Sequence, residues 1–275
     1  MNGYDNLPGL WVSAGNSTIR GLVINRTSGG DALLITSSGG NIIEGNYFGV
    51  DVAGTSILSN NANIVIQSSN NVVGGTTAAA RNVVSGSNSA GIIVLDAGAG
   101  AGGNVIQGNY VGTDATGTSA LGNVNGIVLA ANGNIVGGAM PGAANVISGN
   151  TGKGVYITGQ GNQVLGNIIG ADVSGTLPLG AQDGIEISGE TAAYNVIGSS
   201  APGGGNIISG NAQFGLLLYE SGGDNVIHGN NIGTDPSGVG PVPNFNGIGI
   251  FASGESIGGP DPGEGNVVAF NTSIG

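Results

Sequence analysis

The sequence predicts an all-β solenoid, a coil of short strands, and three observations support that prediction. One eleven-residue motif recurs along the chain, starting at Asn41, Asn104, Asn162 and Asn225 and ending each time in aspartate. Apolar residues alternate with other residues over short runs, which is the periodicity of strands. Glycine and asparagine, which tolerate turn conformations, bound each run. A unit repeated in this way buries its apolar side by stacking on its neighbours, so we expect one elongated coil.

The first strand of each turn of the coil is the easiest element to place. Runs such as Gly154-Val-Tyr-Ile and Gly184-Ile-Glu-Ile alternate between inward apolar and outward positions. They recur roughly every thirty residues, a spacing typical of solenoids. About nine such turns, at a strand spacing of about 4.8 Å, would form a rod about 43 Å long. The predicted starts are Gly9, Ala32, Asn63, Gly91, Gly126, Gly154, Gly184, Gly215 and Gly247.

A second and a third short strand follow within each turn. Asn134-Ile-Val-Gly-Gly represents the second strand, and Asn145-Val-Ile-Ser-Gly-Asn represents the third. Three strands joined at glycine and asparagine corners predict a triangular cross-section. The long repeat therefore spans two turns. One ends its third side in Ser-Gly-Asn, and the other carries a longer excursion containing Gly-Thr-Asp.

Three runs carry a resemblance to a known family: Ser17-Thr-Ile-Arg-Gly-Leu-Val-Ile-Asn25, the Gly-Asn-Tyr-Val-Gly-Thr-Asp run at Gly108, and the Asn-Val-Ile-Ser-Gly-Asn run at Asn145. They resemble the right-handed parallel β-helix repeats, with the pectin-lyase-like fold, of large secreted bacterial surface proteins. The resemblance implies a right-handed, single-stranded parallel β-helix with three short strands per rung. It also implies asparagine ladders at the corners, with Asn134 stacked over Asn162. Unrelated activities are grafted onto this scaffold, so the resemblance predicts fold better than function.

The domain organisation follows from the even texture of the repeats. We expect residues 1–275 to form a single parallel β-helix domain. The chain begins close to a strand and stops at Ile274-Gly275 inside a rung, so we also expect a fragment of a longer chain with uncapped ends. An uncapped end exposes unpaired backbone groups, which predicts a monomer or weak end-to-end association.

Composition narrows the classes of partner. Sixteen acidic and four basic residues give a net charge of −12, which argues against nucleic acid and anionic membrane surfaces because no basic patch is available. The chain contains no run of about 20 apolar residues, so we expect no membrane insertion. The absence of cysteine removes disulfides and thiolate metal sites. No signal peptide is recognisable at Met1, yet the resemblance implies an extracellular or cell-surface location.

The outward position of each first strand forms an unusual surface. It holds Trp11, Leu34, Val65, Ile93, Val128, Tyr156, Glu186, Leu217 and Gly249, which predicts an apolar stripe along the rod. We expect the excursions to fold over it through Leu58, Leu121, Leu179 and Val242. The alternative is a binding surface made of Trp11, Leu34, Ile93, Tyr156 and Leu217, because exposed stripes of this size mark partner or ligand sites.

The recurring aspartates are the candidate metal ligands. Asp51, Asp114, Asp172 and Asp235 each occupy an excursion, one for every two rungs. Calcium needs six to eight oxygens, more than one carboxylate supplies. We therefore expect each aspartate to cap its own turn, with calcium as the alternative and no other cofactor.

One cluster contains the residue types that catalysis would need. Rung alignment places Lys153 beside Asp183 and Tyr156 beside Glu186. A pair of carboxylates serves glycoside hydrolysis, and a lysine or tyrosine base serves polysaccharide elimination. The alternative is an exposed ion pair of little energetic weight.

These observations favour a non-catalytic extracellular scaffold or adhesive module of a bacterial surface or secreted protein, binding polysaccharide or cell-surface glycan. Active sites interrupt repeats, and these repeats are hardly interrupted. The alternative function is a carbohydrate-active enzyme on the same fold, either a polysaccharide lyase or a glycoside hydrolase, with Lys153, Tyr156, Asp183 and Glu186 as its catalytic candidates.

Overall fold

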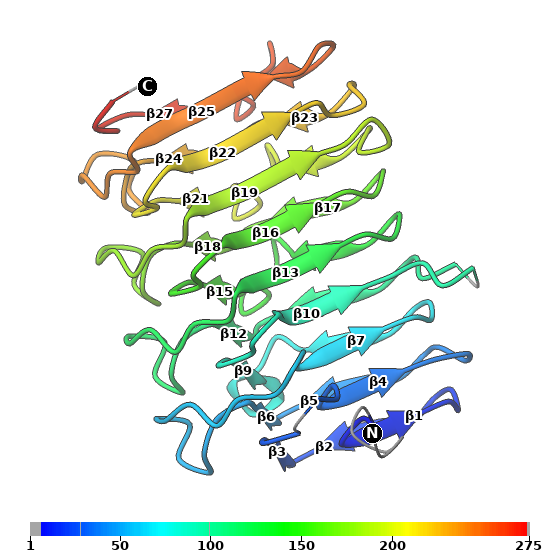
Figure 1. The fold of residues 1–275 in the computed structure, drawn as a ribbon. Coiled ribbons are helices and arrows are strands. Elements are labelled where there is room, and N and C mark those ends of the chain that lie inside the picture. The colour runs from blue at the N-terminus through cyan, green and yellow to red at the C-terminus, as the bar shows by residue number, and fades with distance from the viewer. Residues whose placement is uncertain (1–6, 28, 99, 274–275) are drawn as a thin grey trace.

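The computed structural model describes residues 7–27, 29–98 and 100–273. Within these residues, 27 short strands and one 3-10 turn, η1 (Ala78–Ala80), form nine stacked rungs with three strands each. Every strand pairs in parallel with its counterparts in the neighbouring rungs, so three nine-stranded sheets run along the rod (Figure 1). The all-β coil predicted from the repeats and the parallel β-helix implied by the resemblance are therefore confirmed. The expected last residue of the repeats, Ile274, lies outside the described residues.

The first sheet contains the longest strands. Its members are β1 (Leu10–Val12), β4 (Leu33–Ile35), β7 (Ile64–Ile66), β10 (Ala90–Val94), β13 (Asn125–Leu129), β16 (Lys153–Ile157), β19 (Asp183–Ser188), β22 (Phe214–Tyr219) and β25 (Asn246–Phe251). All nine begin within one residue of the starts predicted from the sequence.

The second and third sheets consist of strands of two or three residues. The second sheet contains β2 (Thr18–Arg20), β5 (Ile42–Glu44), β8 (Val72–Gly74), β11 (Val105–Gln107), β14 (Ile135–Gly137), β17 (Gln163–Leu165), β20 (Val196–Ile197), β23 (Val226–Ile227) and β26 (Ser256–Ile257). The third sheet contains β3 (Val23–Ile24), β6 (Tyr47–Phe48), β9 (Val83–Val84), β12 (Tyr110–Val111), β15 (Val146–Ile147), β18 (Ile168–Ile169), β21 (Ile207–Ile208), β24 (Asn231–Ile232) and β27 (Val267–Val268).

A single apolar core runs along the axis of the rod. In the first sheet, the side chains of Val155, Ile157, Ile185 and Ile187 are fully buried, as the alternation predicts. The residue between each pair, such as Glu186, points outward and remains partly exposed. Parallel pairing in register carries this alternation from rung to rung, so each inward residue stacks on another apolar residue.

Asparagine ladders hold two of the three corners. Asn134 donates from its backbone N–H to Asn162 Oδ1 at 2.9 Å and from its side-chain amide at 3.3 Å, which confirms the stacking expected for this pair. The ladder between the first and second sheets comprises Asn41, Asn71, Asn104, Asn134, Asn162, Asn195 and Asn225, and its last amide contacts Glu255. The ladder between the second and third sheets comprises Asn46, Asn82, Asn109, Asn145, Asn167, Asn206, Asn230 and Asn266.

Glycine is required where the chain turns next to a neighbouring rung. Gly137, which ends β14, has a φ of +84°. A side chain there would also collide with the backbone carbonyl of Leu165 in the next rung. The abundance of glycine therefore reflects close rung stacking as well as turn conformation.

The four excursions all leave the third sheet and return to the first. They follow β6, β12, β18 and β24, one for every two rungs, as the two-rung repeat predicts. Each is a small hairpin closed by an antiparallel bridge, for example between Thr113 and Ala120. The excursions project from the corner between the third and first sheets (Figure 1).

Candidate functional site

The outward stripe of the first sheet forms in the register predicted for it. Trp11 pairs with Leu34, and Tyr156 pairs with both Val128 and Glu186. Trp11 remains 62% exposed and donates from Nε1 to Thr36 Oγ1 at 2.9 Å. The other members of the proposed binding surface, Leu34, Ile93, Tyr156 and Leu217, are half-buried. Side chains one strand spacing apart cover one another's flanks, so stacking itself shields much of the stripe.

The excursions do not cover this stripe, so that expectation is wrong. Leu58 hydrogen-bonds through its backbone to Gly49 and Arg26, and Leu121 bonds to Gly112 and Gly86. These partners belong to the corner and the loops beside it, and the excursions project sideways there (Figure 1). Each hairpin is closed on its own strand ends. The exposure of the stripe therefore varies with its own stacking, from 62% at Trp11 to 4% at Val65.

The excursion aspartates are engaged by their own turns. Asp114 Oδ1 accepts backbone N–H groups from Thr118 and Ser119 at 3.0 and 3.2 Å, and Thr116 donates its hydroxyl. Burial, the largest single influence, acts to raise the pKa of Asp114, but these hydrogen bonds together outweigh it and lower the pKa. Asp51, Asp172 and Asp235 accept N–H groups in the same way, and their pKa values are also lowered.

This geometry bears directly on the calcium hypothesis. Among the described residues, no group of three or more His, Cys, Asp or Glu side chains is arranged to hold a metal ion. Each excursion supplies one carboxylate, whose oxygens already accept N–H and O–H donors. The turn-capping hypothesis accounts for these contacts without a cation.

The cluster on β16 and β19 forms, but its ion pair differs from the expected one. Lys153 pairs with Asp183 and Tyr156 pairs with Glu186 in the strand register. Lys153 Nζ nevertheless lies 3.4 Å from Glu186 Oε2, and 5.5 Å from the centroid of the Tyr156 ring. The lysine side chain therefore reaches across the outward face and forms its ion pair with the glutamate.

Asp183 differs from Glu186 in its environment. Asp183 is 2% exposed, and its Oδ1 accepts the backbone N–H of Phe214 at 3.0 Å. Burial raises its pKa, and the Phe214 N–H and the charge of Lys153 offset only part of that effect. A buried carboxyl with a raised pKa thus lies on the same strand as an outward carboxylate paired with lysine.

The third corner, between the third and first sheets, lacks a continuous ladder. Asn123 donates to Asn150 Oδ1 at 3.2 Å, and Asn211 donates to Asn244 Oδ1 at 2.9 Å. Between these pairs the corner residue is Ala181, which has no amide. In a continuous ladder, the corner residue of the Ala181 rung would donate to Asn211 Oδ1. That oxygen is buried and has no hydrogen-bond partner.

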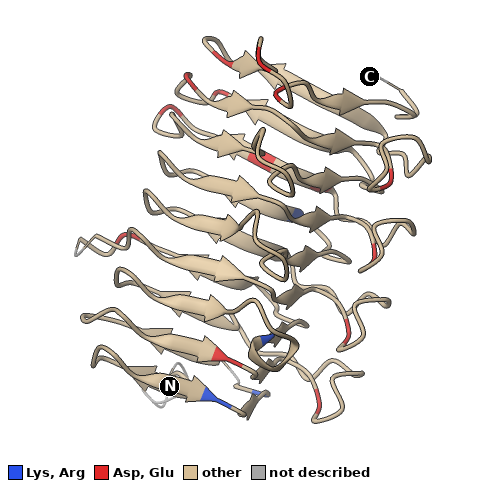
Figure 2. Cartoon of the chain, turned by 180° about the vertical axis from the view of Figure 1, so that it is seen from behind, with Lys and Arg blue, Asp and Glu red and all other residues tan. Residues whose placement is uncertain are grey.

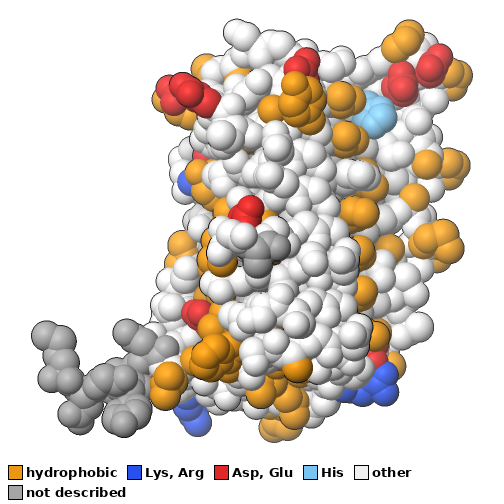
Figure 3. All heavy atoms as spheres, turned by 90° about the vertical axis from the view of Figure 1, so that its right-hand side faces the viewer, with side chains coloured by type: hydrophobic (Ala, Val, Ile, Leu, Met, Phe, Trp, Pro, Cys, Tyr) orange, Lys and Arg blue, Asp and Glu red, His pale blue; other side chains and the backbone are white. Residues whose placement is uncertain are grey.

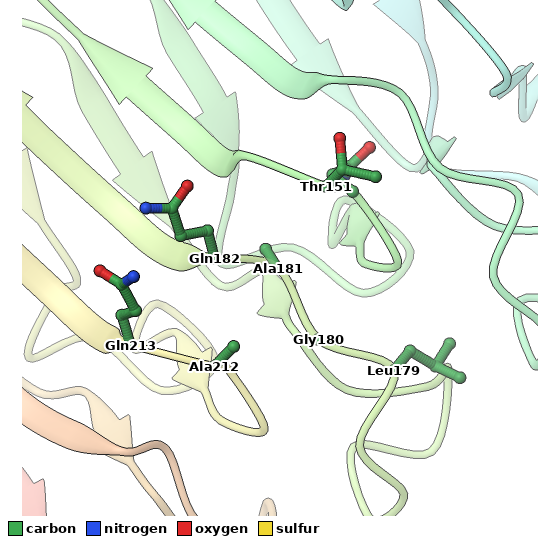
Figure 4. A pocket seen from close by; sticks show the side chains of 8 residues that line it. Thr151, Leu179, Gly180, Ala181, Gln182, Ala212 and Gln213 are labelled. Carbon is green, nitrogen blue, oxygen red and sulfur yellow. The ribbon is translucent and has the colours of Figure 1, made fainter.

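An open hollow lies at this interruption, at the starts of β16, β19 and β22. Its volume is about 540 Å³, and its lining includes Thr151, Ala181, Gln182 and Gln213. The side chains of Gln182 and Gln213 lie side by side at the strand starts, with Thr151 on the next rung (Figure 4). Gln182 directly precedes Asp183, and Thr151 lies two residues before Lys153. The hollow and the cluster therefore adjoin.

The hollow has only a weak signal in the sequence. The corner tripeptides Leu58-Ser-Asn and Leu121-Gly-Asn become Leu179-Gly-Ala at the third excursion, which was the available signal. A single missing amide has little weight in a sequence pattern. It becomes visible when the neighbouring asparagines are seen to depend on it.

Comparisons with family models, with curated proteins and with solved structures gave no match to this chain. Among the described residues, no helix is long and apolar enough to cross a membrane.

Proposed function

We propose that this chain is a non-catalytic β-helical scaffold, of the pectin-lyase-like type, in a secreted or cell-surface bacterial protein, and that it binds a neutral glycan at the hollow on β16, β19 and β22. The observation that carries the proposal is the division of the carboxylates. Glu186 faces outward but is paired with Lys153, whereas the side chain of Asp183 is buried and accepts the Phe214 N–H. Hydrolysis needs two carboxyl groups flanking the substrate bond.

The chemistry of the hollow supports a glycan ligand. Gln182 and Gln213 are exposed, and side-chain amides both donate to and accept from sugar hydroxyls. Thr151 adds a hydroxyl, and Tyr156 offers a ring on the adjoining face. An uncharged polymer suits this surface best, because a chain with net charge −12 repels acidic polysaccharides.

Binding to a panel of neutral oligosaccharides tests the proposal. We expect the Gln182→Ala, Gln213→Ala double variant to lose most of the affinity. Gln163→Ala changes an equally exposed glutamine on the second sheet and serves as the matched control. Affinity that survives the double variant, or falls equally in the control, would contradict a site at the hollow.

A glycoside hydrolase is the second candidate, and the raised pKa of Asp183 favours it. Two carboxyl groups in different environments, one of them buried with a raised pKa, are the arrangement that acid and base catalysis requires. Incubation with the oligosaccharides that bind, followed by measurement of new reducing ends, separates the two functions. Product formation that disappears in Glu186→Gln would replace the scaffold proposal, whereas binding without product supports it.

A further inference from the structure

A compact aromatic surface occupies the first sheet at its C-terminal end. The ring of Phe214 lies over Gly249, where an added Cβ would come within 2.6 Å of the ring. Phe214 and Phe251 make an edge-to-face contact, with ring centroids 6.4 Å apart, and Tyr219 lies 6.4 Å from Phe251 at a tilt. Tyr219 and Phe251 are 46% and 59% exposed. The rings therefore hold one another in place while presenting apolar area to solvent.

The charge of the rod is divided along its length. Residues 154–275 contain ten of the sixteen acidic residues and none of the four Lys and Arg residues, which gives this segment a net charge of −10. Residues 1–153 contain the other six acidic residues and all four basic ones, for a net charge of −2. Lys and Arg lie on the lower and middle rungs, whereas Asp and Glu occur along the whole rod and are most numerous on the upper rungs (Figure 2).

Acidic side chains border the aromatic surface. Glu220 follows Tyr219 directly and is exposed, and its backbone N–H bonds to the Phe251 carbonyl at 3.2 Å. Glu190 lies in the loop after β19, the strand beside Tyr219. Acidic groups lie beside apolar ones at the upper end of the rod (Figure 3). Within residues 154–273, Lys and Arg are absent, so these carboxylates have no cationic side chain from their own segment.

We propose that this surface, formed by Phe214, Tyr219, Phe251 and Glu220, docks an arginine-containing basic segment of a partner protein. Guanidinium groups stack on aromatic rings and pair with carboxylates, so one side chain uses both features of the surface. Opposite potentials also speed the encounter and select the partner. A neutral glycan would contact only the aromatic rings. The acidic charge at this end of the rod would then play no part in recognising the ligand. The ring of Phe214 starts beside the hollow, but Tyr219, Phe251 and Glu220 lie at the other ends of β22 and β25, so variants of these three residues leave the lining of the hollow unchanged.

Fluorescence anisotropy with synthetic peptides tests the proposal on the intact chain. The probes are an arginine-rich peptide and the same peptide with each arginine replaced by glutamine. We expect the first alone to bind, and its affinity to fall as salt screens the carboxylates. The Tyr219→Ala, Phe251→Ala double variant should lose about tenfold in affinity, within the range of cation–π contacts. Glu220→Gln should give a smaller loss.

Phe270→Ala is the matched control, because this half-exposed aromatic follows β27 on the third sheet of the same acidic segment. It should retain full affinity. Equal binding of the two peptides, or equal losses in the control and the double variant, would overturn the proposal. So would displacement of the peptide by neutral oligosaccharide that fails to bind the double variant, because the surface would then be a glycan site.

Discussion

The two continuous ladder corners and the interrupted third corner follow the same rule with different results. At the first two, each asparagine oxygen accepts a backbone N–H of the preceding rung, as Asn145 Oδ1 does from Asn109. The Asn145 amide also donates to the Ile106 carbonyl of that rung. At the third, the excursions depart and Ala181 replaces the amide, leaving Asn211 Oδ1 unpartnered. Identical corner residues thus give continuous hydrogen bonding along the rod, whereas one different corner residue leaves an unpartnered oxygen and a hollow.

Loss of one amide from a continuous ladder should produce the largest effect. Asn145→Ala removes hydrogen bonds to Asn109, Ile106 and Asn167, all in a buried corner. Unsatisfied buried groups cost about 1–3 kcal/mol each, so we expect a loss of about 3 kcal/mol or more. Thermal unfolding measures it, with exposed Asn88→Ala as the control. Equal melting temperatures would mean that the ladders contribute little.

Repair of the third corner should have the opposite sign. Ala181→Asn places an amide opposite Asn150 and Asn211, and we expect it to add about 1 kcal/mol from the hydrogen bonds it restores. That gain corresponds to a rise of roughly 2–4 °C in melting temperature for a chain of this size. A lower melting temperature would show that the local backbone does not fit an asparagine ladder.

The buried carboxyl at the edge of this corner should make stability depend on pH. Because the pKa of Asp183 is raised in the folded chain, its contribution is greatest below the unfolded pKa near 4 and falls as the pH rises through the folded pKa. Asp183→Asn keeps an acceptor for the Phe214 N–H and should remove that fall, so the variant should be more stable than the parent at neutral pH. Denaturant unfolding at several pH values provides the measurement. A variant less stable than the parent at pH 7 would contradict it.

The excursions should give the smallest effects. Because hydrogen bonds lower the pKa of Asp114, its contribution is present above the unfolded pKa and is lost as the pH falls through the folded value. The Asp114→Ala, Asp172→Ala double variant should change the melting temperature only slightly, since both turns lie outside the core. Chelator should leave the parent unchanged. A large drop restored by calcium would establish a metal site instead.

The fold was predictable because its evidence is local and repeated. Alternation at Ile185, Glu186 and Ile187 indicates which side chains enter the core, and stacking requires every rung to agree. The register that places Lys153 beside Asp183 also followed from alignment of the repeats. The ion pair between Lys153 and Glu186 could not be predicted in this way. Register gives the spacing of the backbones, whereas an ion pair depends on the direction and burial of the side chains.

By itself, the sequence determined the all-β coil, the two-rung repeat, the inward and outward residues and the asparagine corners. These depend on period and residue type, which stacking copies from rung to rung. The tertiary structure alone decided that the excursions do not cover the stripe on the first sheet, that Ala181 creates a hollow, and that Phe214 lies over Gly249. Those features depend on contacts between rungs that differ from their neighbours. A repeat pattern averages over such differences.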